Sequence, residues 1–162
     1  MGRTIAVTGV AGGIGAELAG LLRSQGHRVI GFDVRETAEN VDRFIPLDLA
    51  DTSSIEAAAA AMEVPLDGLC NNAGLPPRDG LEAVLLQVNF LGTRYFTDLV
   101  KARLSPEGAI VNVASRAGAQ WQKNLDQVLR LGALTNPDQV PAFIAREAID
   151  ATRAYNLSKE AV

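Results

Sequence analysis

The chain has 162 residues but only one cysteine and one histidine, and each scarcity excludes a class of protein. A single cysteine, Cys70, cannot form an intramolecular disulfide, and its place at the end of an apolar stretch indicates a buried thiol. The single histidine, His27, belongs to no Cys/His/carboxylate cluster with the spacing of metal ligands. We therefore expect a chain without disulfides and without a metal site.

Long apolar runs and basic clusters are also missing. No stretch approaches the ~20 apolar residues that span a bilayer, and no basic region precedes a long apolar stretch at the N-terminus. The chain has 15 Lys and Arg against 19 Asp and Glu, which gives a formal net charge of −4, and the basic residues are scattered. We therefore expect neither nucleic acid nor membrane as a partner, and a cytoplasmic location.

What the chain does contain is an alternation of two hydrophobic patterns. Residues are 48% hydrophobic, which is enough for the core of one globular domain. Short apolar stretches typical of buried strands alternate with longer stretches that have helical apolar spacing. This βαβ alternation predicts an α/β fold, a doubly wound parallel sheet with helices on both faces. The expected strands are 3–8, 27–32, 43–47, 66–71 and 109–114, and the expected helices are 16–25, 52–62 and 81–104.

A glycine-rich turn joins the first expected strand to the first expected helix, in the run Gly9-Val10-Ala11-Gly12-Gly13-Ile14-Gly15. Without Cβ atoms the backbone can approach a pyrophosphate, and the helix N-terminus offers unpaired N–H groups and a positive dipole end. The alternative is a tight βα turn that is merely rich in glycine.

An acid stands about twenty residues beyond the glycines. Asp33 ends the second expected strand, where a carboxylate can hold the ribose hydroxyls of a dinucleotide and repel a 2′-phosphate. The sequence therefore favours NAD over NADP, although Arg35, two residues on, could turn toward a phosphate.

Polar residues also follow the other expected strands. Ligands bind beyond the carboxyl ends of strands in parallel sheets, which makes these residues candidates. For Asp48 the alternative is a helix N-terminal acid, and for Asn71 and Asn72 it is a turn that tolerates unusual dihedral angles. The positions are Asp48, the run Asn71-Asn72-Ala73-Gly74, and Ser115.

Near the end of the chain, Tyr155 and Lys159 stand four residues apart. On a helix they share a face, so the ammonium can favour the ionised form of the phenol. A phenol beside a fixed cation is suited to the proton exchange that alcohol–ketone interconversion requires. Taken alone, the pair is also typical of a solvated helix surface.

Together these motifs resemble the short-chain dehydrogenase/reductase family, and their order along the chain is that of the family. The resemblance implies a Rossmann-type fold and an oxidoreductase that transfers a hydride between NAD(H) and a secondary alcohol or ketone. It implies cofactor contacts at Thr8, Gly9, Gly13, Ile14, Gly15, Asp33, Arg35, Asp48, Leu49, Asn72, Ala73, Gly74, Tyr155 and Lys159, and a catalytic tetrad of Asn89, Ser115, Tyr155 and Lys159.

The resemblance also assigns roles to the tetrad. Tyr155 would be the general acid–base, and Lys159 would assist it and bind the nicotinamide ribose. Ser115 would hold the substrate oxygen, and Asn89 would bind a water that connects Lys159 to solvent. Without the family, Asn89 has an alternative interpretation as a polar residue that bonds backbone and bends its helix.

The spacing from Ser115 to Tyr155 is longer than in many family members, which predicts an inserted helical hairpin at 116–154. Its helices are expected at 121–134 and around 140–149, with a turn at Asn136-Pro137-Asp138. The hairpin could roof an apolar substrate, remodel a subunit interface, or be a surface embellishment. With this insertion the chain is most similar to the bacterial 3α-hydroxysteroid dehydrogenase/carbonyl reductase subgroup.

We therefore expect one dinucleotide-binding domain over 1–162 that lacks its C-terminal portion, since family members continue beyond the Tyr–Lys helix. The substrate would be a small alcohol or ketone, with a 3α-hydroxysteroid or another apolar carbonyl compound as one option. The family implies a homo-oligomer, a dimer or tetramer. The alternative function is a dinucleotide-binding module, or truncated remnant, that binds NAD without turnover.

Overall fold

The computed structural model describes residues 2–37, 39–62 and 65–162. The chain divides into two compact units, each described here by itself. The first comprises Met1–Ala73 with Tyr95–Val113, and the second comprises Gly74–Arg94 with Ala114–Val162.

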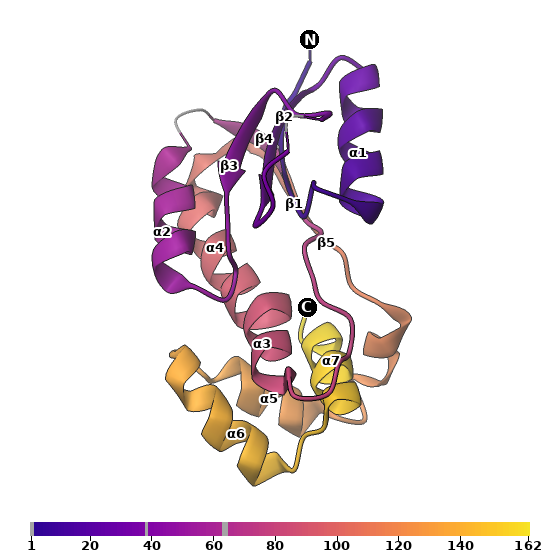
Figure 1. The fold of residues 1–162 in the computed structure, drawn as a ribbon, viewed down its shortest axis with the longest axis vertical. Coiled ribbons are helices and arrows are strands. Elements are labelled where there is room, and N and C mark those ends of the chain that lie inside the picture. Colours follow the sequence, from indigo (N-terminus) through magenta and orange to yellow (C-terminus); the bar gives the residue numbers. More distant parts are fainter. Residues whose placement is uncertain (1, 38, 63–64) are drawn as a thin grey trace. The chain divides into compact units, whose positions relative to one another are not determined.

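The first unit contains a five-stranded parallel sheet with the order β3-β2-β1-β4-β5. From β1 the chain first builds outward through β2 and β3, then returns to the other side of β1 for β4 and β5 (Figure 1). This reversal is the topological switch point of a doubly wound sheet and confirms the predicted fold class. The strands are β1 (Thr4–Thr8), β2 (Arg28–Asp33), β3 (Arg43–Pro46), β4 (Leu66–Asn71) and β5 (Leu104–Asn112).

Helices cover both faces of this sheet. Figure 1 shows α1 (Gly13–Ser24) on one side, and α2 (Thr52–Ala61) and α4 (Thr93–Val100) on the other. On the α1 face Ala19 is fully buried in a core cluster with Val7, Val10, Val29 and Cys70. Burial raises the pKa of the Cys70 thiol, so the expectation of a buried cysteine is confirmed.

The opposite face is closed by an aromatic pair. The ring of Phe32 from β2 meets that of Phe96 from α4 edge to face, with centroids 5.2 Å apart. Both side chains are fully buried. Rings in this geometry add to the stabilisation from buried area, so the pair fixes α4 on the sheet.

The last strand begins earlier than its sequence pattern predicts. We expected 109–114, whereas β5 runs from Leu104 to Asn112 and follows a short 3₁₀ helix, η2 (Lys101–Arg103). Leu66 pairs with Leu104, but Gly68 pairs with Ala109, so the register shifts between these two pairs. The residues between are a bulge, which interrupts the alternation that sequence patterns detect.

The second unit is helical and has its own core. It contains α3 (Glu82–Leu86), η1 (Gln87–Gly92), η3 (Arg116–Gln120), α5 (Leu125–Gly132), η4 (Pro137–Gln139), α6 (Val140–Glu147) and α7 (Ala151–Glu160). The core draws buried side chains from α3, η1, α5, α6 and α7, among them Leu86, Phe90, Leu131, Phe143 and Leu157. None of the helices in the described ranges is both long and apolar enough to cross a membrane.

The helix expected over 81–104 is interrupted. After α3 the chain makes a π-helical segment, η1, before it continues as α4, which ends at Val100. A π segment carries an extra residue in its turn and often marks a functional position. Here the segment contains Asn89, and its predicted part in catalysis stays a prediction.

The segment expected to form a hairpin contains two α-helices joined by a turn, and its status as an insertion stays a prediction. Its first helix begins at Leu125 instead of 121, and the turn is a 3₁₀ segment with a capping box between Asn136 and Gln139. The buried side of α5 carries Leu131, whereas Leu129, which also contributed to the apolar spacing, is 61% exposed.

Candidate active site

The glycine-rich turn after β1 has the geometry of an anion-binding loop. Gly9 has φ +77°, which L side chains rarely adopt, and a Cβ at Gly15 would collide with the carbonyl oxygen of Gly9. The turn delivers the chain to the N-terminus of α1, where no side chain caps the helix and no acid stands in the first turn. These unpaired N–H groups and the open backbone fit a pyrophosphate. Ile14, predicted to contact cofactor, is 69% exposed here.

Thr8 ties the end of β1 to the residues that follow β4. Its buried hydroxyl accepts hydrogen bonds from the backbone N–H groups of Asn72, at 3.1 Å, and Ala73, at 3.0 Å. The Asn72 amide in turn donates to the Thr8 carbonyl at 3.0 Å. The structure thus brings together three predicted cofactor residues from positions more than sixty apart in the sequence.

Asp33 lies against the glycine turn. Its Oδ2 accepts from the Ala11 N–H at 3.0 Å, and its Oδ1 accepts from the Arg35 N–H at 2.9 Å. The Arg35 guanidinium donates to the Ala11 carbonyl at 3.0 Å. Asp33, which favours NAD, and Arg35, which could favour NADP, therefore both contact the same turn.

Asp48 and Leu49 follow β3. Asp48 is exposed and accepts from the Ala50 N–H at 2.8 Å, whereas Leu49 is buried. The cap of α2 is instead Asp51, whose carboxylate accepts from the Ser53 N–H and hydroxyl. These bonds hold the pKa of Asp51 below its ordinary value. Asp48 is therefore not the capping acid, and its contact with a cofactor stays a prediction.

In the second unit, Asn89 acts as a backbone partner for Leu75. Its Oδ1 accepts from the Leu75 N–H at 2.7 Å, and its Nδ2 donates to the Leu75 carbonyl at 3.0 Å. The same Nδ2 lies 3.2 Å from the Ser158 hydroxyl, which donates to the Tyr155 carbonyl at 2.7 Å. Asn89 is 2% exposed, so these bonds form away from water. They connect the π segment to the turns of α7 that carry Tyr155 and Lys159.

Lys159 converges on the same place. A Cβ at Gly74 would stand 3.2 Å from Asn89 Oδ1 and 3.5 Å from Lys159 Nζ, so all three residues are near neighbours. Lys159 is only 9% exposed. Burial lowers the pKa of its ammonium, because the charged form loses hydration.

Ser115 lies at the start of η3, which packs on α7. Its hydroxyl caps η3 by accepting from the Ala117 N–H at 3.2 Å, so its own proton is not used by that bond. η3 packs closely on α7, since a Cβ at Gly118 would collide with the Lys159 carbonyl. A pocket of about 410 Å³ is lined by Ser115 and Lys159, with Ala114, Gly118, Ala119, Trp121, Glu160 and Val162. Tyr155 is half-buried against the core of this unit.

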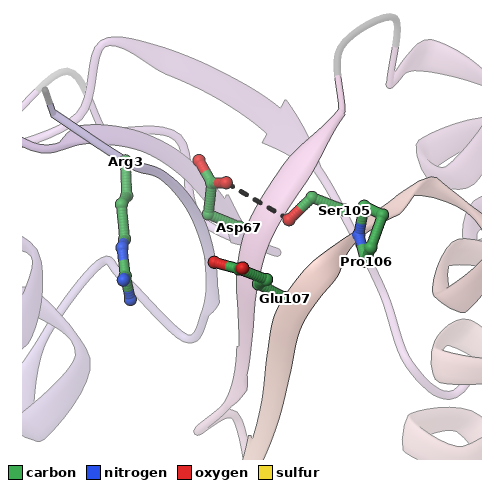
Figure 2. Close-up of a pocket in the computed structure, with 5 residues that line it drawn as sticks. All are labelled: Arg3, Asp67, Ser105, Pro106 and Glu107. Atoms are coloured by element: carbon green, nitrogen blue, oxygen red, sulfur yellow. Dashed lines mark hydrogen bonds between the residues drawn. The ribbon is translucent and has the colours of Figure 1, made fainter.

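Another pocket, of about 400 Å³, lies in the first unit, where β1, β4 and β5 begin (Figure 2). Asp67 is its anchor, because Oδ2 accepts from the Thr4 N–H at 2.8 Å and Oδ1 from the Ser105 hydroxyl at 3.3 Å. Figure 2 shows Arg3 and Glu107 beside this carboxylate. The hydrogen bonds tie together the starts of β1, β4 and β5, which gives Asp67 a role in the sheet.

Several residues that shape the site carry no signal in the sequence. Ser158, whose hydroxyl meets Asn89, is hidden in the Tyr-to-Lys interval that sequence reasoning interprets only at its ends. Leu75 contributes through its backbone N–H and carbonyl, which every residue except proline has, so its residue type gives no signal. Asn71 also has a structural partner set, since its amide donates to Thr97 and Asn112.

Comparisons with known proteins agree with this geometry. A family model described as short chain dehydrogenase matches residues 3–126. The coniferyl-alcohol dehydrogenase of Pseudomonas sp. (strain HR199 / DSM 7063) is 38% identical over 160 residues, which are 99% of this chain and 62% of that protein. The 3-alpha-hydroxysteroid dehydrogenase/carbonyl reductase of Comamonas testosteroni is 27% identical over 126 residues, 74% of this chain and 48% of that protein.

A solved structure is also similar. The 3-alpha-hydroxysteroid dehydrogenase from Pseudomonas sp. B-0831, crystallised in complex with NADH, matches with a TM-score of 0.81 and 30% sequence identity. The match covers 98% of this chain and 62% of that one. The chain thus spans less than two thirds of the length of each of these three relatives.

Proposed function

Because the chain belongs to the short chain dehydrogenase family, we propose that its protein transfers a hydride between NAD(H) and a secondary alcohol or ketone. The observation that carries this proposal is the buried ammonium of Lys159, one helical turn from Tyr155 and beside Asn89 and Gly74. Burying an ammonium costs free energy because it loses hydration. Such buried charges are often found where they take part in chemistry.

In this proposal the first unit binds the dinucleotide. The N–H groups at the start of α1 receive the pyrophosphate, and the absence of an acid in that turn avoids repulsion. Asp33 accepts hydrogen bonds from the ribose hydroxyls next to adenine and repels a 2′-phosphate, which favours NAD over NADP. Arg35 donates to the Ala11 carbonyl and lies against Gly12 of the same turn.

The second unit manages the proton. Bound NAD supplies the hydride acceptor and NADH the donor, so the protein's task is orientation and proton transfer. The Tyr155 phenolate takes the hydroxyl proton during oxidation, and the phenol returns it during reduction, while the Ser115 hydroxyl donates to the substrate oxygen. Lys159 supplies the positive charge that favours the phenolate, and Asn89 fixes the loop at Leu75 next to it.

The relatives support an apolar, cyclic substrate. One is named for coniferyl alcohol and two for 3α-hydroxysteroids, at 38%, 27% and 30% identity. The pocket that Ser115 lines has mostly small or apolar residues, Trp121 among them, which suits a ring system better than a charged metabolite. We therefore propose a hydrophobic secondary or ring-bearing alcohol, hydroxysteroids included.

The test is a screen of secondary and aromatic alcohols, with hydroxysteroids and coniferyl alcohol among them, following NADH absorbance. We expect turnover with NAD in the wild type, and in Tyr155→Phe a loss of turnover of about 10²-fold or more, because the proton acceptor is gone. NAD affinity, measured by calorimetry, should change little, since the phenol contributes little to dinucleotide binding. NAD binding without turnover on any alcohol would favour the non-catalytic module, and full activity of the variant would remove Tyr155 from the role.

A further inference from the structure

A buried ion pair lies on α7 directly beside the residues proposed to act in catalysis. Glu160 directly follows Lys159 in the sequence, and its side chain is 1% exposed. Arg153 donates to both of its carboxylate oxygens, from Nη2 at 2.7 Å and from Nη1 at 3.0 Å. Two parallel bonds of this kind fix the direction as well as the distance between the two groups.

Both members of the pair also bond to the beginning of α5. Asn124, which precedes that helix, donates from Nδ2 to Glu160 Oε1 at 2.7 Å. Gln127, in its first turn, accepts from Arg153 Nε at 2.7 Å. Glu160 and Arg153 therefore connect the catalytic helix to α5 at two points, two helical turns apart.

Glu160 also lines the pocket of Ser115, but its carboxylate is 1% exposed and both of its oxygens are bonded to Arg153 or Asn124. Arg153 and Glu160 are seven residues apart, so at about 100° per residue they share one face of α7. Tyr155 and Lys159 project from the helix at least about 100° away from that face. Because the carboxylate oxygens are already bonded to Arg153 and Asn124, we argue that the network acts on the reaction through the position of α7.

The position of α7 matters because Ser115 is placed by contact with it. Ser115 caps η3, and η3 packs so closely on α7 that Gly118 has no room for a Cβ before the Lys159 carbonyl. A small rotation or translation of the last turn of α7 would therefore change how Ser115 stands relative to Tyr155 and Lys159.

We propose that Arg153 and Glu160 are positioning residues that use Asn124 and Gln127 of α5 to set the rotation of α7 for catalysis. The proposal rests on the proposed dehydrogenase function. In this proposal the start of α5 fixes the orientation of α7 through hydrogen bonds on the face that carries Arg153 and Glu160.

The physical argument separates positioning from stability. A buried ion pair is weak evidence for stability, because its attraction roughly offsets the loss of hydration, and apolar residues of similar size often replace it without loss. Its bonds are directional, however, whereas apolar contacts allow a helix to rotate or slide. An apolar replacement should therefore restore stability without restoring alignment.

The first experiment compares Glu160→Gln and the double variant Asn124→Ala/Gln127→Ala with the wild type. We expect kcat to fall about tenfold or more in both, since small misplacements of catalytic groups are costly, while substrate KM changes less. Arg130→Met is the matched control, because it breaks the ion pair with Glu147 that joins α5 to α6 and leaves Gln127 and its bond to Arg153 in place. Its melting temperature should fall and its kcat should not.

The decisive variant is Arg153→Met/Glu160→Met. Recovery of the melting temperature with kcat still low supports positioning, whereas recovery of both means that the pair serves stability alone and overturns the proposal. Hydrogen exchange of the amides of residues 157–161 gives a readout independent of activity. Faster exchange in Glu160→Gln and in Asn124→Ala/Gln127→Ala, but not in Arg130→Met, is expected. Unchanged exchange would overturn the proposal, while wild-type inactivity on every alcohol would refute only the proposed function.

Discussion

Asn89 takes the place of a neighbouring strand for Leu75, with 2.7 Å from its Oδ1 to the Leu75 nitrogen and 3.0 Å from its Nδ2 to the Leu75 oxygen. One amide thereby satisfies both polar groups of a loop residue next to Gly74. The π segment is what places the amide here, because it rotates Asn89 out of regular helical register.

Replacing Asn89 by leucine should therefore destabilise the protein by about 2 kcal/mol, since it leaves the Leu75 N–H and C=O without a partner. Urea unfolding measures this difference. The control is Gln87→Leu in the same π segment, where a half-buried amide is replaced and a change within about 0.5 kcal/mol is expected. Equal losses in both variants would show that Asn89 has no special role in this loop.

Glycine at position 15 should be needed and glycine at position 20 should not, although both lie in α1. Gly15→Ala should destabilise the protein by about 2–3 kcal/mol and weaken NAD binding, because its Cβ meets the carbonyl of Gly9. Gly20→Ala meets only the side chain of Asn40, at 3.3 Å, and alanine favours the helix by about 0.5–1 kcal/mol. Thermal unfolding and calorimetry with NAD measure both effects, and a tolerated Gly15→Ala would contradict the close approach.

Cofactor preference should depend on Asp33. Asp33→Ala should shift the ratio of NAD to NADP affinities toward NADP by about tenfold or more, because the repulsion of a 2′-phosphate is removed. The control is Asp67→Ala, which also removes a carboxylate that accepts a backbone N–H. Asp67 lies at the start of its strand, whereas Asp33 lies at the end of β2 (Figure 2). That variant should lose about 1–2 kcal/mol of stability and keep its NAD/NADP ratio. An unchanged ratio in Asp33→Ala would refute the proposed specificity.

Acid should weaken the hairpin through Glu147. Hydrogen bonds from Arg130, together with Arg146, lower the pKa of Glu147 from 4.5 to about 2. Because the folded state holds the carboxylate ionised more strongly than the unfolded state does, this stabilisation is complete above pH about 4.5 and is lost as pH falls toward 2. The difference in urea midpoint between wild type and Glu147→Gln should therefore be largest at neutral pH and shrink through that window. A constant difference from pH 7 to pH 2.5 would contradict this assignment.

The Rossmann-type sheet was predictable because its evidence is local. The strands are apolar runs that end in polar residues, and the glycines of the first turn serve a backbone geometry that only glycine tolerates well. The strand β4 was placed at its observed bounds, and the carboxyl ends of β1, β2 and β4 carry the predicted polar residues. Periodicity failed at β5, where the pairing register with β4 shifts by three residues, and in the helix over 81–104, which a π segment interrupts.

The sequence by itself determined the fold class, the family and the identities of the candidate site residues, because strand patterns, glycine turns and motif spacing are written in consecutive residues. Tertiary structure alone decided that Asn89 bonds Leu75 and Ser158, and that Glu160 is buried against Arg153 and Asn124. Hydrogen-bond partners depend on which side chains the packed helices bring within about 3 Å, and the side-chain types alone do not contain that distance.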